Sequence, residues 1–109
     1  MSWQASAWAI SQRLGRGKST AKLILLVHCN HAHNDGTASW VSIDTAAADA
    51  ECDRRTAQRA VAWLWRNGYM RLGDQELVSH LPPGRRPIVY DMAMSEERRH
   101  RWAAEASAA

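Results

Sequence analysis

Residues 50–68 read AECDRRTAQRAVAWLWRNG and contain the signals that begin and end one helix. Asp53 suits the N-cap position, because a short acidic side chain accepts hydrogen bonds from the free backbone N–H groups of the first turn. Gly68 suits the C′ position, where the backbone takes a left-handed conformation. Apolar residues recur at helical spacing and predict one buried stripe, made of Ala57, Ala60, Val61 and Leu64.

The opposite side of this predicted helix is basic and carries no acid. At about 100° per residue, the side chains that point away from the stripe are Arg55, Gln58, Arg59, Ala62 and Arg66. Arginine and glutamine match the edges of guanine and adenine in the major groove of DNA. We therefore predict that Arg55, Gln58 and Arg59 face base edges. We expect Arg54 and Arg66 to lie nearer phosphates, and a solvated arginine face on an ordinary helix is the alternative.

The distribution of charge also indicates a polyanionic partner. The chain has 109 residues, which suits one domain with a modest core, and its hydrophobic share of 46% argues against general disorder. Residues 54–86 hold seven arginines and two acids, a net charge of +5, so the remaining residues carry −2 of the total of +3. Such a basic block favours nucleic acid as partner, and added solubility is the alternative.

Four elements are expected before the basic helix. The pattern predicts a helix over Ser2–Gln12 and a second helix that Ser19 or Thr20 caps and that runs to about Ala32. It also predicts an extended segment over Ala38–Val41 and a helix over Ile43–Ala50 with Ser42 as N-cap. The second helix should be the most buried, since its apolar surface is broad. Its predicted core face is Leu23, Leu26, Val27 and Asn30, widened by Ile24 and Leu25.

A hairpin and a last helix are expected after Gly68. Extended segments over Tyr69–Leu72, Leu77–His80 and Ile88–Met92 predict a small hairpin. Its tip follows Pro82-Pro83-Gly84 and carries Arg85 and Arg86, which we expect to contact phosphate or the minor groove. A last helix should start at Ser95, continue through Trp102 and fray over Ala103–Ala109.

Three helices followed by a hairpin, with a short strand after the first, is the layout of a winged helix-turn-helix. The sequence resembles the helix-turn-helix family of phage and plasmid replication initiators and small bacterial regulators. The matching positions are Lys22–Leu26, His31-Ala32, Asp35-Gly36, Trp40–Ser42, Ala46-Ala47, Asp53–Val61, Leu64 and Asn67–Tyr69. The resemblance covers Lys22–Leu72 and, more loosely, the wing to Tyr90. It implies a DNA-binding module and leaves the biological role open.

The expected fold is mainly α with a small β-hairpin, a three-helix core plus wing with extra helices at both ends. We divide the chain into an N-terminal helix and linker (1–17), the winged helix-turn-helix domain (18–92) and a C-terminal helix and tail (93–109). Glu51 departs from the family pattern, in which this turn often has glycine. Ala57 replaces a larger aliphatic residue, and Trp63 and Trp65 are candidates to fill the space. Trp65 is expected to pack under the wing.

The terminal helices are candidates for dimerisation. Trp3, Trp8 and Ile10 at one end and Trp102 at the other supply apolar surface, and tryptophan is enriched at interface anchors. A homodimer would read two half-sites of DNA. The alternative is that both helices fold back on their own core.

Other classes of function find little support. His28, Cys29, His31 and His33 lie close together, but they lack the matched ligand spacing of a structural zinc site, so we expect no metal. We see no catalytic constellation, and we expect no enzyme activity, cofactor or small-molecule ligand. With no secretory signal, Cys29 and Cys52 suggest reduced thiols. The longest apolar run, Leu23–Val27, is too short for a membrane span.

The sequence therefore predicts a cytoplasmic, nucleoid-associated protein that binds specific double-stranded DNA. The preferred role is a transcriptional regulator, most simply a repressor, of a phage or other mobile element. Replication-origin recognition and a directionality or architectural role in recombination are the alternatives. A winged helix that binds protein instead of DNA is the alternative from another class.

Overall fold

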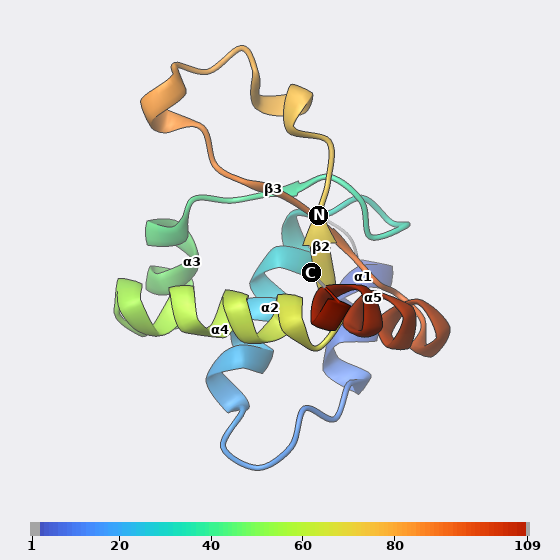
Figure 1. Ribbon diagram of the computed structural model, residues 1–109. Helices are drawn as coiled ribbons and strands as arrows, with labels where there is room; N and C mark the ends of the chain where they lie inside the picture. The colour runs from blue at the N-terminus through green and yellow to red at the C-terminus, as the bar shows by residue number, and fades with distance from the viewer. Residues whose placement is uncertain (1–2, 109) are drawn as a thin grey trace.

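The computed structural model describes residues 3–108. In this part of the chain, five α-helices pack with a small three-stranded sheet, and a long loop rises from the sheet on the side away from α4 (Figure 1). The elements are α1 (Trp3–Ser11), α2 (Ser19–His31), β1 (Ser39–Trp40), α3 (Ile43–Asp49), α4 (Arg54–Arg66), β2 (Met70–Leu72), β3 (Val89–Met92) and α5 (Glu96–Ala108), with 3₁₀ helices η1 (Gln75–Val78) and η2 (Pro83–Arg85) between β2 and β3. The predicted class, mainly α with a winged helix-turn-helix core, is confirmed.

The central helix α2 contacts α1, α3, α4 and β1 (Figure 1). Its buried side chains are Ala21, Ile24, Leu25, His28 and Cys29. The predicted core face was wrong in part, because Leu23 and Asn30 are exposed and Leu26 and Val27 are only partly buried. A run of five apolar residues fits more than one helical stripe, so the neighbouring elements decide which stripe is covered.

Helix starts were predicted better at α3 and α4 than at α2. The Ser42 hydroxyl accepts a hydrogen bond from the backbone N–H of Thr45 at 3.1 Å. Asp53 accepts one from the N–H of Thr56 at 2.7 Å, so both predicted N-caps are confirmed. By contrast, α2 has Lys18 at its N-cap with no side-chain hydrogen bond, so neither Ser19 nor Thr20 caps it.

Small residues let α3 and α4 pack closely against the rest of the core. The buried alanines of these helices and the turn between them are Ala46, Ala47, Ala50, Ala57 and Ala60. The predicted filling of space beside Ala57 by tryptophan was wrong. Trp63 lies on another face of α4 and stacks on Tyr69, with ring centroids 5.9 Å apart, and Trp65 is 37% exposed.

The wing is less regular than the predicted hairpin. Strands β2 and β3 pair antiparallel, with Met70 opposite Met92 and Leu72 opposite Tyr90, and β1 pairs with the other edge of β3. The expected extension at Leu77–His80 was wrong, since residues 75–78 form η1. The reason lies in Gln75, whose amide accepts from the N–H of Val89 at 3.0 Å and donates to its carbonyl at 2.8 Å. The Val89 carbonyl also accepts from the N–H of Gly73 at 2.9 Å, so the Gln75 side chain caps the β2–β3 pairing where a regular hairpin would continue.

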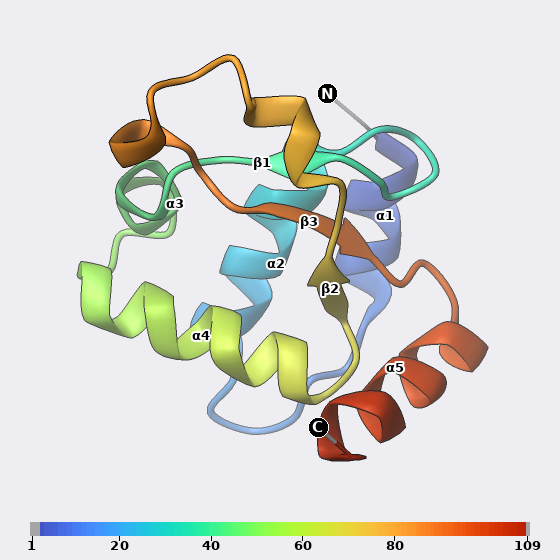
Figure 2. The ribbon, with the colours of Figure 1, turned by 45° about the horizontal axis from the view of Figure 1, so that its top comes forward.

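The loop between β2 and β3 rises from the sheet and reaches over α3 (Figure 2). It contains both η1 and η2. Among the described helices, none is both long enough and apolar enough to cross a membrane.

The N-terminal helix packs through its small residues. Ala5, Ala9 and, just past the helix, Gln12 are buried. Trp3 and Ile10 are 73% and 58% exposed, and Ala7 on the same face of the helix is exposed as well. This face points away from the core.

The C-terminal helix docks on the end of α4 and on β2. Trp102 is only 5% exposed, and the Arg71 guanidinium lies 4.2 Å from its ring centroid. Tyr69 joins three segments, because Trp8 and Trp63 contact its ring and the Arg99 guanidinium lies 5.0 Å above it. The Ser95 hydroxyl caps α5 by accepting from the N–H of Arg98. The predicted fraying was wrong, since α5 is helical to Ala108.

Gly68 permits this docking, and its replacement gives a direct test. Its φ of +81° lies in the left-handed region, and an added Cβ would overlap the backbone oxygen of Arg99 and lie 2.7 Å from the nitrogen of Ala103. We predict that Gly68→Ala lowers the free energy of unfolding by about 2–4 kcal/mol, from backbone strain and displacement of α5. Urea denaturation measures this loss.

Gly84→Ala is the matched control, since no atom lies within 4 Å of the added Cβ. It should change stability by less than about 0.5 kcal/mol. Equal effects of the two substitutions would show that the contact between Gly68 and α5 does not support the fold.

Candidate nucleic-acid interface

The outward face of α4 has the composition that the sequence predicted. Arg55, Gln58, Arg59 and Arg66 are all exposed. The Asp53 cap fixes the start of the helix, and the hydrogen bond from the Thr56 N–H lowers the pKa of its carboxyl group. Among residues 3–108, neither Arg55 nor Arg59 forms an ion pair. Their guanidinium groups are therefore available to an external partner.

Arg54 has a partner within the protein. Its Nη1 lies 2.6 Å from Oδ1 of Asp44, so it links the start of α4 to α3. Both side chains are largely exposed, and such surface pairs contribute little to stability. The pair instead holds Arg54 on the side of α4 that faces α3. This pairing could not be predicted from the sequence, because the two residues are ten positions apart on different helices.

The turn before α4 contains a strained residue. Glu51 has a φ of +54°, a left-handed conformation that glycine adopts more readily than other residues. The backbone N–H of Cys52 donates to the carbonyl of Ala47 at 3.0 Å and closes the turn. Cys52 is partly buried and packs against the core.

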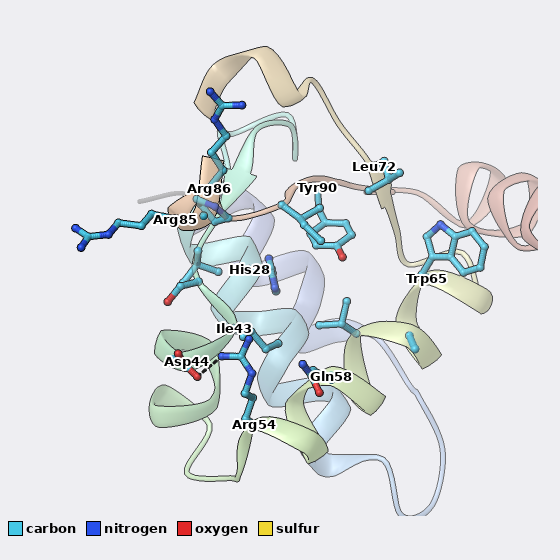
Figure 3. A pocket seen from close by; sticks show the side chains of 17 residues that line it. His28, Ile43, Asp44, Arg54, Gln58, Trp65, Leu72, Arg85, Arg86 and Tyr90 are labelled. Atoms are coloured by element: carbon cyan, nitrogen blue, oxygen red, sulfur yellow. Dashed lines mark hydrogen bonds and ion pairs between the residues drawn. The ribbon is translucent and has the colours of Figure 1, made fainter. Parts of the chain in front are cut away.

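The two arginines of the wing differ in their surroundings. Arg86 donates from Nε to the carbonyl of Leu81 at 2.7 Å and from Nη2 to that of Ser79 at 2.8 Å. It therefore holds the loop in shape. Arg85 makes no such bond among the described residues, and its side chain extends outward (Figure 3). Of the two predicted phosphate contacts, only Arg85 has its guanidinium free.

Comparison with known families agrees with this geometry. Residues 18–70 match the family model described as a helix-turn-helix domain. Residues 18–70 are a helix-turn-helix domain. The match spans α2, β1, α3 and α4 and reaches the first residue of β2, so α4 occupies the recognition-helix position. The search of curated proteins and the search of solved structures gave no significant match.

Outside the helix-turn-helix domain, the dimerisation candidates separate into two groups. Trp102 is buried against β2 and Arg71, so its prediction as an interface anchor was wrong. Trp8 is half-buried beside Tyr69, with ring centroids 6.4 Å apart. Of the four candidates, Trp3 and Ile10 remain as exposed apolar side chains on α1. Both terminal helices thus fold back on the core, and the far face of α1 stays uncovered.

A cavity of about 720 Å³ lies between the helix-turn-helix and the wing loop. Its wall includes Gln58, Trp65 and Tyr90, and His28 of α2 lies at its back (Figure 3). Sequence reasoning missed this feature, since it considered His28 only as a metal ligand. In the described residues, no three His, Cys, Asp or Glu side chains are placed to share a metal ion.

His28 is a neutral histidine in the native state. It is 2% exposed, and burial, aided by the charge of His31, lowers its pKa from 6.5 to about 4. Its Nδ1 lies 3.1 Å from the hydroxyl of Ser39, and that hydroxyl donates to the carbonyl of His28 at 2.7 Å. Because the hydroxyl has one hydrogen, Nδ1 must be the donor to Ser39. Nε2 then carries a free lone pair.

The lowered pKa of His28 predicts acid-sensitive stability. Between pH 6.5 and 4 the unfolded chain binds a proton at this position that the folded chain does not bind. The free energy of unfolding should therefore fall as the pH falls through this window, by on the order of 3 kcal/mol from this residue. Urea titrations at several pH values measure the slope.

His28→Phe should reduce this slope, whereas His33→Phe, at an exposed position, should preserve it. An unchanged slope in His28→Phe would show that other groups cause the acid sensitivity.

Proposed function

We propose that this protein binds specific double-stranded DNA through α4 and acts as a transcriptional regulator. The observation that carries the proposal is the acid-free face of Arg55, Gln58, Arg59 and Arg66 at the recognition-helix position of a helix-turn-helix domain. Paired donors and acceptors of this kind read base edges, and additional arginines contact phosphate. Arg85 on the wing supplies a further positive charge beside the three arginines of this face.

The preferred role within this proposal is repression, in the cytoplasm of a bacterial or phage-infected cell, of genes of a phage or other mobile element. A small winged helix that covers a promoter represses without any catalytic group, and we propose no enzyme activity. Recognition of a replication origin and a directionality role in recombination would use the same face of α4. Selection of bound fragments from random DNA would identify the site and separate these roles.

The central prediction concerns direct readout by Arg59. Arg59→Ala removes a free guanidinium from the outward face and should cost about 1–3 kcal/mol of binding free energy at the selected site. It should also relax specificity at one base position. Fluorescence anisotropy with the selected duplex and with single-base variants measures both effects.

Arg13→Ala is the matched control, an exposed arginine in the linker between α1 and α2. It should leave the affinity within about twofold of the original value. An unchanged affinity in Arg59→Ala would mean that α4 does not read DNA. Failure of the intact protein to bind any duplex at low salt would favour a protein-binding winged helix.

The wing arginines should differ in their effects. Arg85→Ala should weaken binding to selected and random duplexes similarly and lower the slope of log affinity against log salt by roughly one unit. Arg86→Ala loses the two bonds to the loop carbonyls and should increase hydrogen exchange in residues 79–88. If Arg85→Ala lowered the affinity only for duplexes that carry one particular base step, the wing would instead read sequence.

We also propose a homodimer through the exposed face of α1. Trp3 and Ile10 present apolar surface that the core does not cover, and a two-fold dimer would read two half-sites. Sedimentation at micromolar concentration should give a dimer for the intact protein and a monomer for Trp3→Ala with Ile10→Ala. Leu77→Ala, at an exposed leucine of η1, is the control. A monomeric intact chain, both free and on DNA, would contradict this proposal.

A further inference from the structure

The cavity between the helix-turn-helix and the wing loop shares Gln58 and Ala62 with the outward face of α4, but the rest of its wall comes from other elements. Its wall is largely apolar, with contributions from Val41, Ile43, Val61, Trp65, Leu72 and Tyr90. Its volume of about 720 Å³ falls within the range of roughly 300–1,000 Å³ that small-molecule sites occupy. Phosphate oxygens and base edges in a duplex are polar, so this wall suits an apolar ligand better than DNA.

His28 places one hydrogen-bond acceptor at the back of this apolar wall (Figure 3). With Nδ1 turned to Ser39 as donor, Nε2 is the polar atom that the ring offers to the cavity. Among the described residues, Nε2 has no hydrogen-bond partner. Among the described side chains, the buried polar atom that lacks a partner is the indole nitrogen of Trp102, so Nε2 of His28 is open to the cavity and not sealed in the core. A ligand that brings an N–H or O–H donor into the cavity could bond to it.

The position of His28 also argues against a DNA duplex as the occupant. The residue belongs to α2, is 2% exposed and contacts the ring of Tyr90 edge-on at a centroid distance of 5.5 Å. Helix α4 forms one wall of the same cavity. A small molecule can reach a residue this deeply buried more easily than a base that is held within a duplex.

The mouth of the cavity is basic. Arg85 lines it and has no ion-pair partner among the described residues, while Arg54 on the other side is held by Asp44 (Figure 3). Trp65 and Tyr90 provide aromatic rings in the wall. A planar ring held against this wall that carries an acidic group would be attracted to the Arg85 guanidinium at the edge of the cavity.

We propose that this cavity binds a planar aromatic acid that donates a hydrogen bond to Nε2 of His28 and presents its carboxylate to Arg85. Such a ligand contacts α4 through Gln58 and Val61 and the wing loop through Arg85 and Ile88. It would fix the distance between recognition helix and wing. A role for this ligand in regulating DNA binding rests on the proposed DNA-binding function, whereas the binding of the ligand to the cavity does not.

Three small probes test the chemistry without DNA. Indole-3-acetate has the ring, the N–H donor and the carboxylate; 1-methylindole-3-acetate lacks the donor, and indole-3-acetamide lacks the charge. Titration to millimolar concentration is followed by the histidine ring nitrogens and backbone amides in ¹H–¹⁵N NMR spectra. We expect indole-3-acetate to shift the His28 ring signals and the amides of Val61 and Leu72.

The analogues should bind more weakly. Loss of the donor should weaken binding roughly three- to tenfold, and loss of the exposed charge roughly two- to fivefold. His28→Phe should bind the indole and its N-methyl analogue equally, and Arg85→Ala should bind the acid and the amide equally. His33→Phe is the control and should keep both preferences. If His28→Phe does not fold, Ala62→Trp replaces it, because this exposed site on α4 lines the cavity and a large side chain there should block every probe.

Three outcomes would overturn the proposal. One is the absence of shifts at the cavity residues with all three probes. Another is equal affinity of the intact protein for the indole and its N-methyl analogue. The third is a shift of the His28 ring signals with duplex DNA alone, which would make the cavity part of the DNA interface. Loss of DNA binding by Arg59→Ala, or its absence in the intact protein, leaves these probe results unchanged, so the two proposals fail separately.

Discussion

The contact between Gly68 and α5 fixes the relation between the recognition helix and everything that follows it. A positive φ turns the chain directly from α4 into β2, and the missing side chain lets the backbone of α5 lie against the turn. Tyr69, the next residue, is covered from three sides by Trp8, Trp63 and Arg99. The end of α4, the start of the wing and both terminal helices thus share one packed junction.

The opposite end of α4 depends on short-range polar contacts instead. The Asp53 cap sets the first turn, the Cys52 N–H closes the link to α3, and Glu51 takes a left-handed conformation between them. Buried alanines on both helices allow a close approach to α2. With its two ends held in this way, α4 presents a fixed row of arginines, and rigid placement of this kind is what base recognition requires.

Hydrogen bonds from its own side chains hold the wing loop in shape, and the loop leaves an open cavity beside α4. Gln75 supplies the hydrogen bonds that a paired strand would give to Val89, and Arg86 closes the far part of the loop on its own carbonyls. These side chains hold the loop away from α4, so a cavity remains over Val61 and Trp65. A regular two-stranded hairpin would have no such internal framework. The irregular wing therefore leaves the Arg85 guanidinium free and leaves room for a candidate ligand site. Because both belong to the same loop, a shift of the loop would change both together.

Local sequence determined the features that depend on neighbouring residues. The limits of α4, the caps at Ser42 and Asp53, the glycine at its end and the outward arginines all follow from helical spacing and backbone hydrogen bonding, which act within a few positions. Tertiary structure decided which stripe of α2 is buried, that Trp102 is covered and Trp3 is not, and that Gln75 replaces a strand. It also placed His28 behind the cavity with a free Nε2. These outcomes depend on residues far apart in the chain, because burial is settled by whichever elements pack together, and one sequence pattern fits several such arrangements.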